Sequence, residues 1–308
     1  HKVLMKYKES ASGQLFEEGI NEAGATSTFI AAATSFSTHA CMTIPFYIFY
    51  SMFGFQRVAD LIWSAADQRA RGFLIGATSG RTTLNGEGLQ HQDGHSLLMA
   101  HTNPAVRAWD PAFAYELATI IQYGIKEMVD EDKDVIHYIA VYNENYPMPA
   151  KPKSVDEGII KGLYMLRGAP KGDGPVVRLI GSGPIMLQVL DAVEKLEEFG
   201  VRSEIWSATS YGELRRDGLE VDRWNRLNPG KEVKKTWTQT QLGDSKTPII
   251  AVSDNMAAVP DMVRKWMPEN FEILGTDGFG RSDTREALRR FFEIDGVSIT
   301  LAALSQLV

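Results

Sequence analysis

The residues best suited to chemistry lie in three short segments of the first hundred residues. A carboxylate, Glu22, stands in Gly-Ile-Asn-Glu-Ala-Gly at 19–24, and an aromatic run, Phe-Tyr-Ile-Phe-Tyr-Ser-Met-Phe-Gly-Phe-Gln-Arg, fills 46–57. A glycine-rich segment at 85–95 adds Glu87, His91 and His95. A carboxylate, stacked rings and imidazoles together suit a site that holds a flat heteroaromatic cofactor and moves protons beside it.

The hydrophobic pattern around these segments predicts alternating strands and helices. We predict strands at 44–49, 73–77, 105–109 and 136–142, helices at 21–34, from 55 onward and at 111–129, and a polar loop at 78–96. Alternation of this kind predicts a mostly parallel sheet that is covered on both faces. Tyr50 and Phe53 then fall where a strand ends and a helix begins, which is where α/β proteins place ligands.

A second block repeats the alternation after a segment with three prolines at 147, 149 and 152, which favours an extended strap. We predict an α/β fold of two consecutive, mostly parallel-sheet domains: residues 1–150, a connector at 151–175, and 176–308. Its expected elements are strands at 176–180, 203–208, 249–252 and 271–274, helices between the first two strands and at 259–266 and 284–292, a capping box of Asp283 with Glu286, and an uncapped final helix at 298–308.

Composition excludes several classes of protein. A net charge of −7 without a basic stripe argues against nucleic acid as a partner. The sequence shows neither an apolar run long enough to span a membrane nor a signal peptide. The single cysteine, Cys41, fits a reducing compartment and is expected to be buried and inert. His1 is not an initiator methionine, and the expected final helix at 298–308 lacks a cap. We therefore expect the chain to be interrupted at both ends.

Each candidate also has a structural interpretation. By spacing alone, Glu22 fits a solvated helix-face glutamate, and Phe46, Phe49 and Phe55 are expected to be core. Two histidines four residues apart suggest a metal pair only on a helix, and the glycines at 86, 88 and 94 predict a loop instead, so no metal ligands are assigned.

Two glycine-rich turns lie outside the first block. Gly181-Ser182-Gly183 imitates a dinucleotide-binding turn but lacks its third glycine, and we interpret it as a tight strand-to-helix turn. The segment 275–283, Gly-Thr-Asp-Gly-Phe-Gly-Arg-Ser-Asp, imitates a phosphate loop without the lysine. We expect it to be structural or to contact another subunit.

Across essentially all 308 residues, the chain resembles the back portion of the thiamine-diphosphate-dependent first component of the homodimeric bacterial pyruvate dehydrogenase complex. The Gly-Ile-Asn-Glu, Gly-Phe-Gln-Arg and Gln-His motifs and segment 275–283 carry this resemblance. It implies that Glu22 bonds the cofactor's pyrimidine and favours its proton-abstracting form, that Phe53 stacks on that ring, and that Tyr50 and His91 are active-site residues. Glu87, His95 and Arg57 would support them.

The resemblance also implies a homodimer of three-domain subunits that decarboxylates pyruvate in the cytoplasm. The two-carbon unit would pass to the lipoyl group of dihydrolipoyl acetyltransferase. The Mg²⁺ ligands and diphosphate contacts would lie in a front domain, since Gly172-Asp173-Gly174 lacks the context of a thiamine diphosphate motif. We therefore expect weak cofactor binding by this chain alone. Two alternatives stay open: another thiamine diphosphate enzyme (a 2-oxo acid dehydrogenase or a transketolase), or a non-catalytic docking or assembly module.

Overall fold

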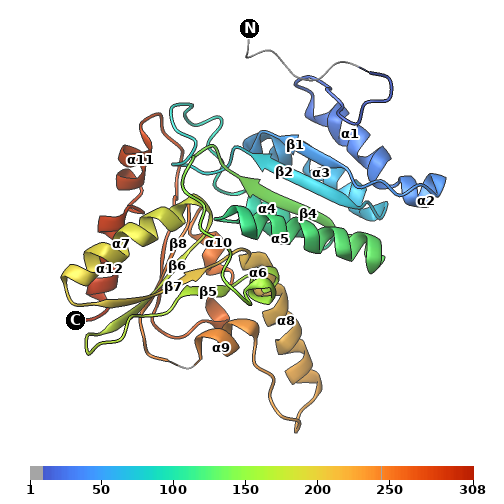
Figure 1. Ribbon diagram of the computed structural model, residues 1–308. Helices are drawn as coiled ribbons and strands as arrows, with labels where there is room; N and C mark the ends of the chain where they lie inside the picture. Colours follow the sequence, from blue (N-terminus) through green and yellow to red (C-terminus); the bar gives the residue numbers. More distant parts are fainter. Residues whose placement is uncertain (1–9, 244) are drawn as a thin grey trace.

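The computed structural model describes residues 10–243 and 245–308. These residues form two mostly parallel sheets (Figure 1). The first has the order β1-β2-β4-β3, all parallel, from β1 (Phe46–Phe49), β2 (Gly72–Ala77), β3 (Val106–Trp109) and β4 (Ile136–Val141). Its helical elements are α1 (Glu22–Ala33), α2 (Ser35–His39), η1 (Ser51–Phe53), α3 (Gly54–Asp67), α4 (Ser96–His101), α5 (Ala114–Ile125) and η2 (Lys126–Asp130).

Both faces of the first sheet are buried at its central strands β2 and β4, as the alternating sequence predicts. Phe73 and Ile139 point into a core under α5, whereas Leu74 and Tyr138 point to the opposite core under α1, α3 and α4. Successive side chains of a strand alternate between faces, so one strand supplies both cores.

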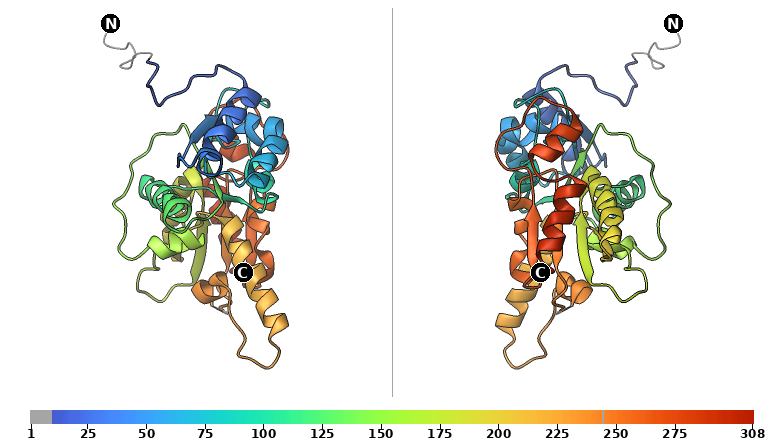
Figure 2. Two further views of the ribbon diagram at one scale, coloured as in Figure 1. Left: turned by 90° about the vertical axis from the view of Figure 1, so that its right-hand side faces the viewer. Right: turned by 90° about the vertical axis from the view of Figure 1, so that its left-hand side faces the viewer.

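The second sheet has the order β5-β7-β6-β8-β9, in which only β5 is antiparallel to its neighbour. Its strands are β5 (Tyr164–Arg167), β6 (Val176–Gly181), β7 (Arg202–Ser207), β8 (Ile249–Val252) and β9 (Phe271–Leu274). The helical elements around it are α6 (Asp156–Lys161), η3 (Gly183–Ile185), α7 (Met186–Glu198), α8 (Tyr211–Leu227), α9 (Trp237–Leu242), α10 (Ala258–Asp261), η4 (Arg264–Trp266), α11 (Arg285–Phe291) and α12 (Gly296–Ser305). The helix α8 and the loop after it extend away from the body of the molecule (Figure 2).

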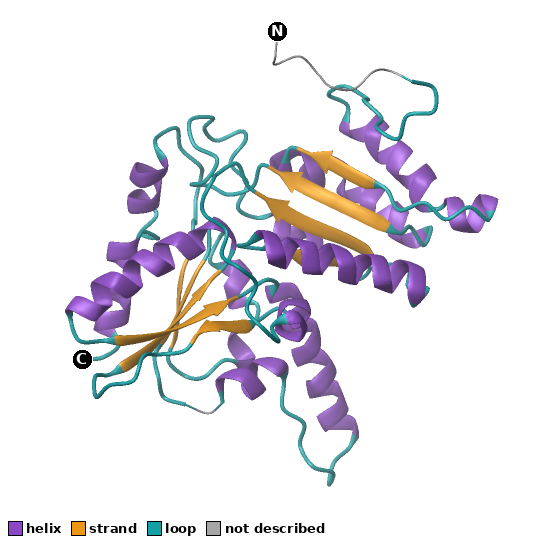
Figure 3. Cartoon of the chain, in the orientation of Figure 1, coloured by secondary structure: helices purple, strands orange, loops and turns teal. Residues whose placement is uncertain are grey.

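The two sheets meet at the carboxyl ends of their strands (Figure 3). Asp110, directly after β3, accepts a hydrogen bond from the Tyr142 hydroxyl, and its backbone carbonyl accepts one of 3.2 Å from the Gly183 amide. A Cβ on Gly183 would lie 2.8 Å from an Asp110 oxygen and 2.9 Å from the Tyr142 hydroxyl. The glycine turn at 181–183 therefore packs against the first domain, which supports its interpretation as a structural turn.

Several expected elements differ in detail. The expected connector contains α6 and β5, so the second sheet begins before residue 176; β5 is a short edge strand between glycines, with too few residues for a periodic signal. The helix predicted at 259–266 is broken into α10 and η4. The helix at 111–129 changes to the π-helix η2 after Ile125, and α12 ends at Ser305.

The capping and burial predictions also need correction. Thr284, not Asp283, caps α11, because its side chain accepts the Ala287 amide. Cys41 is exposed in the loop between α2 and β1, so the expectation of a buried thiol is wrong. Phe49 and Phe55 are core, whereas Phe46 is 47% exposed because β1 is an edge strand. Among the described residues, no helix is long and apolar enough to cross a membrane.

The buried Asp110 predicts a pH-dependent stability. Burial raises the pKa of Asp110 to about 6, although the hydrogen bonds from Tyr142 and Ser182 oppose the rise. Between about pH 4 and 6 the unfolded chain loses this proton first, so the free energy of unfolding should fall as pH rises, by about 3 kcal/mol in total at neutral pH. Asp110→Asn should remove this part of the slope in urea unfolding, while Asp261→Asn, on the exposed surface, should leave it. Parallel pH profiles for wild type and Asp110→Asn would contradict the prediction.

Candidate active site

Glu22 is the first residue of α1 and is largely shielded from solvent. Asn21 caps the helix by accepting the Gly24 amide at 3.0 Å, which places the Glu22 carboxylate at the positive end of the helix dipole. Its side chain is 16% exposed, and both oxygens accept from Nη1 of Arg57, at 3.0 and 3.1 Å. The solvated-glutamate interpretation of Glu22 does not match this arrangement.

Phe53 and Tyr50 are presented by a sharp turn at the carboxyl end of β1. The chain leaves the strand at Phe49, forms the single turn η1 and enters α3 at Gly54. Only glycine fits at 54, since a Cβ there would lie 2.0 Å from the Phe49 ring. The turn places the Tyr50 and Phe53 ring centroids 6.1 Å apart.

His91 joins these two rings from the 78–95 loop. Its ring centroid lies 5.3 Å from Tyr50 and 5.3 Å, edge-on, from Phe53. Its Nδ1 atom lies 3.1 Å from a carboxylate oxygen of Glu87. Glu87 can thus orient the imidazole, whose side chain is 23% exposed. Among the described residues, no group of three or more His, Cys, Asp or Glu side chains is arranged to hold a metal ion.

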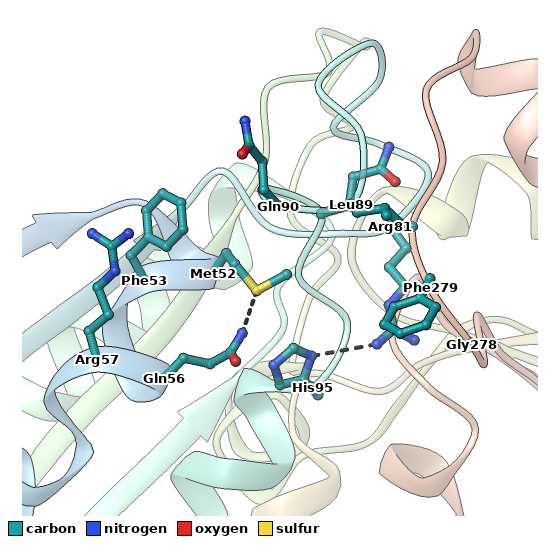
Figure 4. A pocket seen from close by; sticks show the side chains of 12 residues that line it. Met52, Phe53, Gln56, Arg57, Arg81, Leu89, Gln90, His95, Gly278 and Phe279 are labelled. Atoms are coloured by element: carbon teal, nitrogen blue, oxygen red, sulfur yellow. Dashed lines mark hydrogen bonds between the residues drawn. The ribbon is translucent and has the colours of Figure 1, made fainter.

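A pocket of about 760 Å³ adjoins this cluster. Phe53 and Arg57 lie on one side of it, Arg81 and Phe279 on the other, and His95 between them (Figure 4). The pocket is also lined by Met52, Gln56, Leu89, Gln90, Gln92, Gly278 and Gly280. Part of segment 275–283 therefore borders the same pocket as three of the predicted site residues.

The structure thus brings all seven predicted residues into one region. Glu22 contacts Arg57, whose guanidinium carbon lies 4.0 Å from the Phe53 ring centroid. Phe53 in turn contacts Tyr50 and His91, and His91 contacts Glu87. His95 stands apart from the rings, with its Nδ1 atom 3.5 Å from Nη2 of Arg81.

Sequence reasoning missed the buried polar residues beneath the site. Asp93 is 2% exposed and accepts the amides of His95 and Ser96, both at 3.0 Å, and the Ser51 hydroxyl. It therefore ties the 78–95 loop to the turn that carries Phe53. The sequence could have indicated this role, because an aspartate just before a helix often accepts amides of its first turn.

The Arg57 guanidinium lies between the Glu22 carboxylate and the Phe53 ring, the two groups that the resemblance assigns to the cofactor's pyrimidine. The Arg57 guanidinium is a flat nitrogen cation that stacks on Phe53 and donates to Glu22 at once. By the resemblance, the aminopyrimidine of the cofactor would make these same two contacts. The Arg57 side chain is 50% exposed, so its ion pair contributes only about 0.2–1 kcal/mol and a ligand can displace it.

Comparison with known families gives a consistent result. Residues 1–149 match the family described as the pyruvate dehydrogenase E1 component middle domain, and residues 162–295 match the transketolase-like TK C-terminal domain. The chain is 54% identical over 306 residues to the pyruvate dehydrogenase E1 component of Pseudomonas aeruginosa, covering 99% of this chain and 35% of that protein. For the Escherichia coli K12 protein the identity is 49%, covering 98% and 34%.

Solved transketolases share the fold. The Campylobacter jejuni enzyme aligns with a TM-score of 0.65 at 16% identity, covering 90% of this chain and 38% of that one. A split-gene transketolase, described as an inactive beta4 tetramer, aligns with a TM-score of 0.66 at 15% identity, covering 94% and 82%. At such identities the likeness establishes the fold alone.

The chain spans about a third of the length of the curated relatives it matches. Its identity to them extends over nearly all of its residues, and its two parts match two successive domains. The chain belongs to the family of the bacterial pyruvate dehydrogenase E1 component, of which it carries the middle domain and a transketolase-like C-terminal domain.

Proposed function

We propose that this chain supplies the pyrimidine-binding half of the active site of a thiamine-diphosphate-dependent pyruvate dehydrogenase. In the full-length protein, pyruvate would be decarboxylated and its two-carbon unit passed to a lipoyl group of dihydrolipoyl acetyltransferase. The observation that carries the proposal concerns the shielded Glu22 carboxylate. It pairs with the same Arg57 guanidinium that lies over the face of the Phe53 ring.

The chain's own residues would hold the cofactor and handle protons. When bound, thiamine diphosphate supplies the nucleophilic carbon that attacks the carbonyl carbon of pyruvate. Glu22 would bond a ring nitrogen of the pyrimidine and hold a proton there, because its partial burial strengthens such a hydrogen bond. Phe53 would give that ring its flat apolar wall.

Two further side chains would face the substrate. The Tyr50 hydroxyl would donate a hydrogen bond to it, since this ring is 46% exposed beside Phe53. His91 would bind the substrate carboxylate, or give a proton to the substrate oxygen on which negative charge develops, with Glu87 orienting the ring. Arg57 and His95 would support the site from the pocket wall.

The remaining parts of the site are proposed to lie outside this chain. Mg²⁺ and the diphosphate would be held by the part of the full-length protein that precedes these residues. A homodimer would bring that part of one subunit to the pyrimidine-binding domain of the other. The exposed edge strand β1, with Phe46 47% and Ile48 66% exposed, offers an apolar surface for such a contact.

Substrate choice is tested by turnover of the full-length protein with ferricyanide as electron acceptor. We expect reduction with pyruvate and at least tenfold less with 2-oxoglutarate. A preference for 2-oxoglutarate, or for ketol transfer between sugars, would instead assign another thiamine diphosphate enzyme.

Cofactor binding by the 308-residue chain alone should be weak. It would supply the pyrimidine contacts of Glu22 and Phe53, whereas its described residues hold no cluster of three or more His, Cys, Asp or Glu side chains for a metal ion. Calorimetric titration with thiamine diphosphate and Mg²⁺ should therefore show micromolar affinity for the full-length protein and much weaker binding for this chain. Micromolar binding by the chain alone would contradict this division of the site.

A further inference from the structure

The histidine loop, defined as residues 78–95, depends on the second domain for its shape. It carries Glu87, His91 and His95, yet the backbone bonds across its outer part are short-range, such as those from the His91 and Gln92 amides to the Gly88 carbonyl. A loop held only by such contacts would sample many conformations. Asp93 fastens the end of the loop to Ser51 of the first domain, and two further anchors lie in the second domain.

The first anchor is Asp254, which follows β8 in the second domain and is 1% exposed. One carboxylate oxygen accepts from the amide and hydroxyl of Thr82, at 2.9 and 2.7 Å. The other accepts from the amide and hydroxyl of Thr83, at 2.9 and 2.5 Å. Four donors converge on two oxygens, a demand that a carboxylate meets and a carboxamide does not, because an amide nitrogen is itself a donor.

The backbone of the loop is packed directly against this carboxylate. A Cβ on Gly80, where φ is +96°, would lie 2.2 Å from an Asp254 oxygen. The Arg81 amide also donates to the Asp254 carbonyl, at 3.3 Å, and the Met256 amide to the Gly94 carbonyl, at 2.8 Å. Both ends of the loop thus rest on residues 254–256.

The second anchor lies beside His91. Gln92 is 1% exposed; its side-chain nitrogen donates to the Leu84 carbonyl at 2.7 Å, and its oxygen accepts the Arg281 amide at 2.6 Å. A Cβ on Gly280 would lie 2.3 Å from that oxygen. Segment 275–283 therefore holds Gln92, the residue next to His91. The Arg81 guanidinium also donates a hydrogen bond to the Thr276 carbonyl.

We propose that Asp254 is a positioning residue, which fixes the histidine loop on the second domain and so sets His91 against Tyr50 and Phe53. This proposal rests on the proposed function, in which His91 acts on the substrate. It gives the C-terminal domain a role in the reaction, because residues at the ends of its strands hold the histidine loop of the first domain in place. Among the described residues, the Asp254 carboxylate bonds Thr82 and Thr83 and neither Glu22 nor Phe53, so it acts on the side of the site that carries His91.

The test uses the full-length protein with Asp254→Asn, Thr82→Val and Thr82→Ser, and with Asp283→Asn as the control. Asp283 belongs to segment 275–283, but among the described residues its carboxylate accepts a hydrogen bond only from the neighbouring Thr284 amide. The measurements are thermal unfolding, cofactor affinity by calorimetry, kcat and KM with pyruvate, and hydrogen exchange of peptides covering 82–95.

For Asp254→Asn we expect a loss in kcat on the order of 10²-fold, since a displacement of about 1 Å of a catalytic group can cost that much. Cofactor affinity should stay within twofold, and exchange should accelerate in 82–95. Thr82→Val should show the same pattern more weakly, Thr82→Ser should recover most of the rate, and Asp283→Asn should match wild type.

Other outcomes are decisive as well. Unchanged kcat and unchanged exchange in a folded Asp254→Asn or Thr82→Val protein would overturn the proposal. So would a parallel loss of kcat, cofactor affinity and melting temperature, which indicates a general structural role. If Asp254→Asn does not fold, the comparison of valine with serine at 82 decides. If wild type has no pyruvate turnover, the proposed function fails, and the exchange data alone decide whether Asp254 anchors the loop.

Discussion

Glu22→Gln in the full-length protein should lower kcat for pyruvate decarboxylation by about 10²–10⁴-fold, the usual contribution of a positioned acid or base. Glutamine keeps the size and position of the side chain beside Arg57 and Phe53 but cannot share a proton with a ring nitrogen. The effect should appear in ferricyanide-coupled initial rates at saturating cofactor.

Glu18→Gln is the matched control. Glu18 lies four residues earlier, is exposed and lacks the pairing with Arg57. We expect wild-type rates from it, and an unchanged oligomeric state for both variants in light scattering. A Glu22→Gln protein that retains more than a tenth of the wild-type rate would sink the proposed role and favour the docking or assembly alternative.

His91→Ala should lower kcat by about 10²-fold or more while leaving cofactor affinity nearly unchanged. The imidazole contacts the Tyr50 and Phe53 rings. Glu22 lies on the other side of Phe53, where it pairs with Arg57. Removal of the imidazole should therefore affect the step that handles the substrate more than the binding of the pyrimidine. Steady-state kinetics with pyruvate, paired with calorimetry, separates the two effects.

Two companion variants sharpen this result. His39→Ala removes an exposed histidine on α2 and should leave the rate unchanged. Glu87→Gln keeps the shape of the partner of His91 but weakens its hold on the ring, and should cost about tenfold. A His91→Ala protein with normal kcat, or one whose main defect is cofactor binding, would show that this ring does not act on the substrate.

Local patterns predicted most of the elements. The strand predictions at 73–77 and 136–142 match β2 and β4 to within one residue, because a strand buried on both faces reads as a continuous apolar run. The predictions failed where an element is short or lies at an edge. β5 has four residues, and Phe46 on β1 stays half-exposed although its sequence is as apolar as that of a core strand.

The candidate site was accessible from the sequence only as a set of residue types. Glu22, Tyr50, Phe53 and His91 stand in motifs that the resemblance could match, and the structure places all four in one region. The pairing of Glu22 with Arg57 joins residues 35 positions apart, and that of Ser51 with Asp93 joins residues 42 apart. Neither pair leaves a periodic signal, since each depends on how separate elements pack.

The amino-acid sequence by itself determined the family, the alternation of strands and helices, and the residues able to do chemistry, because these follow from side-chain type and short-range spacing. Only the tertiary structure decided which buried carboxylates hold the site together. Asp254 meets Thr82 across 172 residues and Asp93 fastens the loop to the turn after β1. Such contacts form where the carboxyl ends of two sheets meet, and that meeting is a property of the packed chain rather than of any segment.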